Sequence, residues 1–370
     1  MKVLIVMPLA EQRGGAEVAL RQLIHGERDH GVTWSVVFLE EGPMVQEFRD
    51  VGIAASVVPA GRLRQGFRDL RSIARIRSIA RHERADVIFS WMTKAHLYGG
   101  VAASIARLPA IWYQHGIPES SWMDRLATIL PASGVIATSE AAAAAQARLR
   151  PARRRRVVHP GIDLDRFDPG RLPPQDAVRQ ELGLPTDVPL VGFFGRLQRW
   201  KGAGVLVDAM PRVLHTFRNT HCVIVGGRHE LEADYPEYLR KRVAALGLEQ
   251  HVMLAGFQAD VPRWMHAMDV IALPSTGEPF GIAVVEAMAM GKPVVAGGSG
   301  GPTEIITTGT DGILVADNPE AVAAGIISYL KQPDFSVRVG AAARERAKQF
   351  STRRYLQELT RTVRELSMAM

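Results

Sequence analysis

Two carboxylates, Glu278 and Glu286, occur in the segment STGEPFGIAVVEAMAMGKPVVA, residues 275–296. Glu278 is followed directly by Pro-Phe-Gly and then by an apolar period, so the sequence predicts a helix that starts near Gly281. The backbone N–H groups of its first turn, from Phe280 to Ala283, have no acceptor within such a helix and can hold a phosphate.

The positions of the two carboxylates suggest different partners. Glu286 lies about one turn inside the predicted helix, and its two acceptor oxygens suit a pair of sugar hydroxyls such as those of ribose. Glu278 lies outside the helix, beside whatever the phosphate carries. A helix-capping acid and an exposed helix residue are the simpler alternatives. The apolar neighbours of Glu286 argue for a partner, because an unpaired carboxylate is costly to bury.

Two cations follow a predicted strand in FFGRLQRWKG, residues 193–202. Gly195 allows a tight exit from the strand, and Arg196 and Lys201 then lie near the start of the next helix. Two cations beside helix N–H groups make a diphosphate site. Solvated surface charges are the alternative, and these residues alone leave both open.

Two further loops carry weaker signals. In GGAE, residues 14–17, the glycines around Gly15 permit close approach of the backbone to an anion. His115, in YQHG, can donate to a substrate oxygen, although a buried structural histidine is the more usual role.

Short apolar runs alternate with helical periods along the whole chain, which predicts parallel sheets covered on both faces. Five strands are expected in the first half and six in the second, with helices at 16–29, 67–82, 139–149 and 352–367. The joint is expected at HPGIDLDRFDPGRLPP, residues 159–174. The fold class is therefore α/β with two doubly wound domains, and the loops named above all follow strands, where such sheets bind ligands.

Composition limits the class of protein. The chain has 370 residues, 47% hydrophobic, which suffices for two domains. A single cysteine, Cys222, excludes a disulfide framework and favours a reducing compartment, so we expect a cytoplasmic location. No stretch of about 20 apolar residues occurs that would span a membrane.

Of the net charge of +7, residues 1–165 carry +6, with 22 Lys and Arg against 16 Asp and Glu. Their arginines include a group at helical spacing: Arg62, Arg64, Arg68, Arg71, Arg75, Arg77, Arg81 and Arg84. An apolar stripe of Phe67, Leu70, Ile73, Ile76 and Ile79 accompanies them. The stripe is expected to pack on its own sheet, while the arginines are either simply solvated or bind an anionic membrane surface.

The segment EPFGIAVVE resembles the Glu-x7-Glu motif of the GT4 family of retaining nucleotide-sugar glycosyltransferases. GGAE, FFGRL…KG, HPGID…F, DVIALPS and GGPTEII…GILV are similar to that family in the same order, over nearly the whole chain. The resemblance implies a GT-B fold, in which two Rossmann-like domains face one another across a cleft. It implies an acceptor domain at 1–165, a nucleotide-sugar domain at 166–350 and a helix at 351–370 that packs back on the first domain.

The same resemblance implies roles for individual residues. Arg196 and Lys201 would neutralise the leaving diphosphate, Glu286 would bind ribose, and Glu278 would contact the transferred sugar. The implied catalytic residues are Glu278, His115, Arg196 and Lys201. The implied nucleotide-sugar-binding residues are Gly15, Arg196, Lys201, Glu278, Phe280, Gly281, Ile282 and Glu286.

Asp163 and Asp165 form an Asp-x-Asp pattern, which in sugar transferases of another fold holds a divalent ion. Here the pattern lies in the expected joint, and Arg196 and Lys201 already supply countercharge. We therefore expect no metal and no other cofactor, with the nucleotide diphosphate sugar as donor substrate.

The expected reaction is transfer of a hexose, with retention, to a lipid-linked or growing glycan of a cell-surface polysaccharide or glycolipid. The protein would then be peripheral on the inner face of the cytoplasmic membrane. A soluble small-molecule acceptor is the alternative, and another GT-B enzyme such as a nucleotide-sugar epimerase is a further one. A nicotinamide dehydrogenase is excluded because PLAEQRGGAE lacks G-x-G-x-x-G. No nucleic-acid partner is expected, because no binding module is recognisable.

Overall fold

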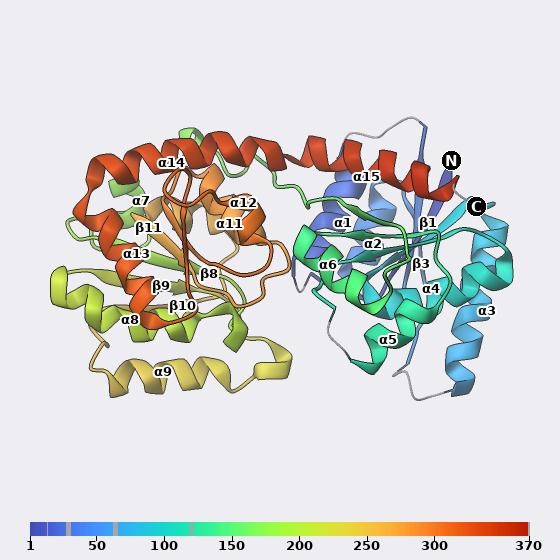
Figure 1. Ribbon diagram of the computed structural model, residues 1–370, viewed down its shortest axis with the longest axis horizontal. Coiled ribbons are helices and arrows are strands. Elements are labelled where there is room, and N and C mark those ends of the chain that lie inside the picture. Colours follow the sequence, from blue (N-terminus) through green and yellow to red (C-terminus); the bar gives the residue numbers. More distant parts are fainter. Residues whose placement is uncertain (13, 27–30, 62–65, 119–120, 369–370) are drawn as a thin grey trace. The chain divides into compact units, whose positions relative to one another are not determined.

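The computed structural model describes residues 1–368 except 13, 27–30, 62–65 and 119–120, and the side chains of 66–69 are also outside the description. The chain forms two compact units (Figure 1). Unit 1 contains Met1–Gly161 and Thr352–Met370, and unit 2 contains Ile162–Ser351. The boundaries expected from the sequence, after residues 165 and 350, lie a few residues from these.

Unit 1 is built on a parallel seven-stranded sheet in the order β3-β2-β1-β4-β5-β6-β7. Its strands are β1 (Lys2–Met7), β2 (Thr33–Phe38), β3 (Ala54–Val57), β4 (Val87–Trp91), β5 (Ala110–Gln114), β6 (Gly134–Ala137) and β7 (Arg155–Val157). Its helices are α1 (Gly15–His25), α2 (Pro43–Asp50), α3 (Gly66–His82), α4 (Met92–Ala106), α5 (Trp122–Ile129), α6 (Glu140–Leu149) and α15 (Thr352–Ser367).

Alternation along β1 divides the core of unit 1 into two layers. Val3, Ile5 and Met7 face α1, α2 and α15, whereas Leu4 and Val6 face α3, α4 and α5. Burial on both faces explains why these strands are almost wholly apolar. The last helix, α15, thus completes one side of the core of unit 1.

Unit 2 is built on a parallel six-stranded sheet in the order β10-β9-β8-β11-β12-β13. Its strands are β8 (Leu190–Phe194), β9 (His221–Val225), β10 (Val252–Gly256), β11 (Val270–Leu273), β12 (Val294–Gly297) and β13 (Ile313–Val315). Its longer helices are α7 (Gln175–Glu181), α8 (Ala203–Thr216), α9 (Tyr235–Ala245), α10 (Val261–Ala267), α11 (Ile282–Ala289), α13 (Pro319–Lys331) and α14 (Pro333–Ala347). A short helix, α12 (Pro302–Ile305), and the 3₁₀ turns η1 (Pro169–Arg171), η2 (Arg199–Lys201), η3 (Glu230–Glu232) and η4 (Lys348–Phe350) complete it.

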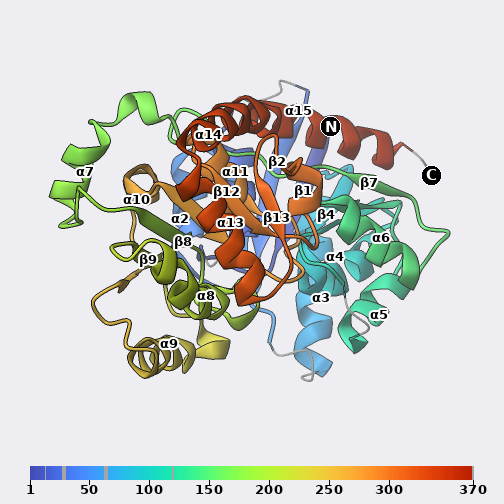
Figure 2. The same cartoon turned by 60° about the vertical axis from the view of Figure 1, so that its left-hand side comes forward.

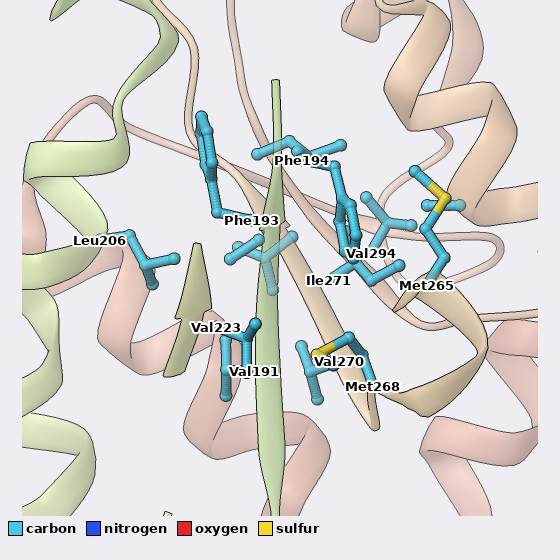
Figure 3. Packing of buried hydrophobic residues seen from close by; sticks show 14 of the residues in the cluster. Val191, Phe193, Phe194, Leu206, Val223, Met265, Met268, Val270, Ile271 and Val294 are labelled. Carbon is cyan, nitrogen blue, oxygen red and sulfur yellow. The ribbon is translucent and has the colours of Figure 1, made fainter. Parts of the chain in front are cut away.

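Side chains of β8 fill both layers of the core of unit 2. Figure 3 shows Phe193 and Phe194 on opposite sides of the strand, with Leu206 of α8 on one side and Met265 of α10 on the other. Helices α8 and α13 pack side by side in both views (Figure 1, Figure 2). Helices therefore cover both faces of this sheet, as the apolar strands predict.

Two doubly wound parallel sheets confirm the predicted fold class. All six strands expected in the second half are present, as are five of the seven strands of unit 1. The sequence patterns did not predict β3 and β7, the two edge strands of unit 1. Both are short, and neither is a continuous buried apolar run.

Candidate active site

The order of strands in unit 2 marks one place where a ligand can enter. The chain runs from β8 outward through β9 to β10, and it returns to β11 on the other side of β8. The loops that follow β8 and β11 therefore lie next to one another at the carboxyl edge of the sheet, at the point where the strand order reverses, which is where doubly wound sheets bind ligands. The first loop carries Arg196 and Lys201, and the second carries Glu278.

The side chains of Lys201 and Glu278 meet at this edge. Lys201 Nζ donates to Glu278 Oε2 at 2.6 Å, and the two side chains are only 18% and 12% exposed. The ammonium also lies 4.2 Å from the ring centroid of Trp200. Arg196 is partly buried, and its side chain has no ion pair or hydrogen bond with any described residue. Of the two cations predicted for this site, Lys201 is thus paired and Arg196 is not paired with any described residue.

Backbone contacts hold the two loops together. The amide of Thr276 donates to the carbonyl of Trp200 at 2.8 Å, and the hydroxyl of Ser275 donates to the carbonyl of Lys201 at 3.3 Å. Gly202 has φ +83°, and a Cβ there would lie 2.1 Å from the carbonyl oxygen of Pro274. Only glycine permits this approach, which sets the position of Lys201 beside the second loop.

Helix α11 begins where the sequence predicts, with Gly281 as N-cap (φ 110°) and Ile282 as first residue. No side chain caps it, and the amides of Ile282 and Ala283 donate to no backbone carbonyl of a described residue. The side chain of Phe280 is 3% exposed and packs on Phe350 with ring centroids 5.7 Å apart. Any contact of Phe280 with a ligand would therefore come from its backbone.

Glu286 lies in the second turn of α11, partly buried. Burial raises the pKa of its carboxyl to about 7, and the positive charge of Arg166 opposes that rise. No described residue donates a hydrogen bond to its carboxylate. A ligand hydroxyl could donate the hydrogen bond that no described residue donates to this carboxylate.

In unit 1 the strand order changes direction between β1 and β4. Gly15 opens α1 after β1, and no side chain caps that helix. His115 directly follows β5, the neighbour of β4. The structure thus brings Gly15 and His115 to the same edge of this sheet.

Trp91, the last residue of β4, contacts both the start of α1 and His115, and the sequence patterns did not indicate it. Its indole Nε1 donates to the carbonyl of Ala16 at 3.0 Å, and its ring stacks on that of His115 with centroids 5.1 Å apart. Nε2 of His115 is buried without a hydrogen-bond partner among the described residues. Burial lowers the pKa of His115 to about 3, so the imidazole is neutral at physiological pH. An aromatic residue at a strand exit, in VIFSW, was the available signal.

The Asp-x-Asp pattern has a local structural role. The carboxylate of Asp163 accepts from the amides of Asp165 and Arg166 at 3.0 and 3.1 Å, and Asp165 pairs with Arg171 at 2.5 Å. Over the part of the chain that the structure describes, no group of three or more His, Cys, Asp or Glu side chains could hold a metal ion.

The basic helix predicted in the first half is α3. Of the predicted apolar stripe, Ile76 is buried and Ile73 and Ile79 pack partly buried against the same core, whereas the prediction was wrong for Leu70, which is 64% exposed. Arg71, Arg75 and Arg81 are exposed, and the side chain of Phe67 lies outside the description. Arg62 and Arg64, and the side chain of Arg68, lie outside the description. Among the described helices, none combines the length and the apolar character required to cross a bilayer.

Comparison with known proteins identifies relatives over the whole chain. Residues 13–166 match the family model described as Glycosyltransferase Family 4, and residues 174–346 match the model described as Glycosyl transferases group 1. HepE of Anabaena, solved in complex with UDP and glucose, is 30% identical, with a TM-score of 0.86 over 98% of this chain and 99% of HepE. The complex of HepE with UDP-glucose gives a TM-score of 0.84 at 30% identity, over 99% of this chain and 100% of HepE.

The D-inositol 3-phosphate glycosyltransferase of Streptomyces scabiei is 37% identical over 203 residues. The match covers 52% of this chain and 45% of that protein. The chain therefore spans about half the length of the curated relatives it matches.

Proposed function

Because the chain belongs to glycosyltransferase family 4, with the GT-B fold, we propose that it transfers a hexose from a UDP-sugar to an acceptor hydroxyl with retention of configuration. The observation that carries this proposal is the pairing of Lys201 with Glu278 at 2.6 Å, where the exits of β8 and β11 meet. The UDP and UDP-glucose complexes of HepE support the choice of donor.

The predicted site residues of unit 2 each have a proposed part in the reaction. Arg196 and Lys201 stabilise the charge that develops on the diphosphate as the glycosidic bond breaks. The first-turn amides of α11 bind a phosphate. Glu286 accepts from ribose hydroxyls, and Glu278 lies beside the sugar ring, where its carboxylate stabilises developing positive charge.

For unit 1 we propose that two residues bind substrate. The backbone N–H at Gly15 would bind a phosphate oxygen, and the neutral imidazole of His115 would bind a sugar hydroxyl. The leaving phosphate takes the proton of the attacking hydroxyl, so the bond to the acceptor forms on the face that the diphosphate leaves. No divalent ion is required, because the two cations and the helix amides supply the countercharge.

The acceptor is proposed to be a soluble small molecule. The names of the curated relatives favour this reading over the lipid-linked or glycan acceptor expected from the sequence. The assay combines UDP-hexoses with inositol phosphates and other polyols, follows UDP release, and determines the anomeric configuration of the product by NMR. A product of inverted configuration contradicts retention, and turnover lost to a chelator and restored by Mn²⁺ contradicts metal independence.

A glycan or glycolipid at an anionic membrane is the second candidate, and two helix faces of unit 1 favour it. Helix α3 exposes Arg71, Arg75 and Arg81. Helix α5 exposes three apolar side chains on one face: Trp122 (56%), Leu126 (43%) and Ile129 (71%). Such a combination suits binding at a lipid interface. Flotation with neutral and with anionic liposomes tests it, and equal recovery with both would remove this candidate.

A further inference from the structure

The loop after β9 is hydrogen-bonded to the loop that carries Arg196 and Lys201. Leu197 forms an isolated parallel bridge with Arg228, and its amide donates to the carbonyl of Gly227 at 2.9 Å. At the other end of the β8–α8 loop, the amide of Gly204 donates to the hydroxyl of Tyr235 at 2.9 Å. The β8–α8 loop is therefore fixed at both ends by residues 227–235.

Arg199 holds the middle of the same loop. Its guanidinium donates to Asp234 at 2.7 Å and to Glu232 at 3.3 Å, and its own amide donates to Glu232 at 2.9 Å. The guanidinium also lies over the rings of Tyr235 and Tyr238, 5.0 and 5.6 Å from their centroids. Arg199 is the first residue of η2 and Lys201 is the last, so the turn that orders one side chain also orders the other.

The contacts of Arg199 fix the conformation of the β8–α8 loop more than they raise the free energy of unfolding. The Arg199 side chain is 52% exposed, and exposed ion pairs add little to the free energy of unfolding. A loop already held in its binding conformation loses less conformational entropy when a ligand arrives, and this raises affinity without any new contact to the ligand. The proposed ligand is a nucleoside diphosphate, and the two cations that would bind it lie on either side of Arg199.

We propose that Arg199, held by Glu232 and Asp234, is a positioning residue that preorganises Arg196 and Lys201 for the diphosphate of the donor. The inference rests on the proposed function, since it assigns no contact between Arg199 and the donor. It also assigns a role to acidic residues, Glu232 and Asp234, that ordinary electrostatics would make unfavourable near a bound diphosphate.

The direction in which Glu232→Ala changes the affinity for UDP distinguishes a positioning role from simple charge repulsion. Glu232→Ala removes a negative charge, so simple charge repulsion predicts tighter UDP binding, whereas loss of positioning predicts weaker binding. We expect Glu232→Ala and Arg199→Ala each to weaken UDP by about tenfold, the size of one moderate coupling. Uridine, which has no phosphate, should bind all variants alike. Calorimetry measures UDP and NMR titration measures uridine.

Asp208→Ala is the matched control, because Asp208 pairs with Arg242 on α9 and has no contact with η2. Its UDP affinity should equal that of the wild type. Unchanged or tighter UDP binding by Glu232→Ala, an equal loss in Asp208→Ala, or a parallel loss of uridine would each overturn the inference. Failure of the wild type to bind UDP would instead overturn the proposed function, and the inference with it.

Discussion

Lys201 and Glu278 neutralise one another at the edge of the sheet of unit 2, and a bound diphosphate would compete for the ammonium. Lys201 could then pair with phosphate, which leaves the carboxylate of Glu278 beside the sugar. Because both side chains are largely buried, this exchange would take place where charges interact strongly.

Removal of either cation should slow the reaction without unfolding the protein. Arg196→Ala is the cleaner variant, since no described residue depends on its side chain, whereas Lys201→Ala leaves Glu278 unpaired. Loss of one stabilising contact to a leaving group costs about 2.7–4 kcal/mol, so turnover should fall by about 10²–10³. Steady-state release of UDP measures it.

Arg218→Ala is the control for charge alone, because Arg218 is exposed and precedes β9 at the opposite end of the strands. It should turn over like the wild type. Near wild-type rates for both Arg196→Ala and Lys201→Ala would remove the assigned role.

Glu286 should make stability depend on pH. Its pKa is raised from 4.5 to about 7, so the folded protein binds more protons than the unfolded chain in this window. The free energy of unfolding should therefore fall as pH rises from about 4.5 to 7, by about 1–3 kcal/mol relative to Glu286→Gln, and change no further above it. Urea unfolding at several pH values measures the difference.

A matched variant distinguishes this effect from those of other carboxylates. Glu320→Gln, near the start of α13, removes an acid that is 59% exposed and that pairs, among the described residues, with Arg212. Its difference from the wild type should stay nearly level over the same range. A level difference for Glu286→Gln as well would show that its pKa is not raised.

At the scale of elements, the strand exits of unit 2 are close-packed backbone. The sequence predicts a tight exit at Gly195, but a Cβ at Gly195 would make only ordinary contacts, the nearest at 3.5 Å. A Cβ at Gly226, after β9, would lie 1.9 Å from the carbonyl oxygen of Gly195. The position that requires glycine is therefore Gly226, after the neighbouring strand, and the prediction for Gly195 was wrong.

Alanine substitution separates the two glycines. Gly226→Ala must push the β8 and β9 exits apart, which should lower the free energy of unfolding by about 1–3 kcal/mol and weaken UDP binding. Gly195→Ala should remain close to the wild type in stability. Thermal unfolding with and without UDP provides both quantities, and equal stability of the two variants would contradict the packing described here.

At the scale of the molecule, the end of the chain belongs to the unit that contains its beginning. Leu359, Val363 and Leu366 of α15 are buried in the same core layer as β1 and α1. The chain therefore leaves unit 1 near residue 161 and returns to it near residue 352. Loss of α15 contacts should weaken unit 1 rather than unit 2.

Leu359→Ala tests this division. A fully buried leucine truncated to alanine costs about 2–5 kcal/mol, and the unfolding transition of unit 1 should move to lower temperature. UDP should still raise the transition of unit 2, which supplies the proposed diphosphate site. Calorimetry resolves the two transitions, with Arg361→Ala as control because that side chain on α15 is 68% exposed. A lowered transition for unit 2 alone would contradict the assignment.

The sequence by itself determined the features that depend on neighbouring residues. Apolar runs predicted eleven strands. The helical spacing of apolar residues, together with the glycine and proline residues that flank it, placed the start of α11 near Gly281 and the bounds of α15 at about 352–367. It missed β3 and β7, because an edge strand is paired on one side only and needs no continuous apolar run. Arg196, Lys201, Glu278 and Glu286 could be selected as candidates because their types and spacing are local too.

Only the tertiary structure decided which of these residues meet. Lys201 and Glu278 are 77 positions apart, Arg199 and Glu232 are 33 apart, and Trp91 and Ala16 are 75 apart. Each contact exists because the order of strands in a sheet places separate exits side by side, and no local pattern encodes that order. The raised pKa of Glu286 has the same origin, since desolvation depends on every element packed around the carboxyl.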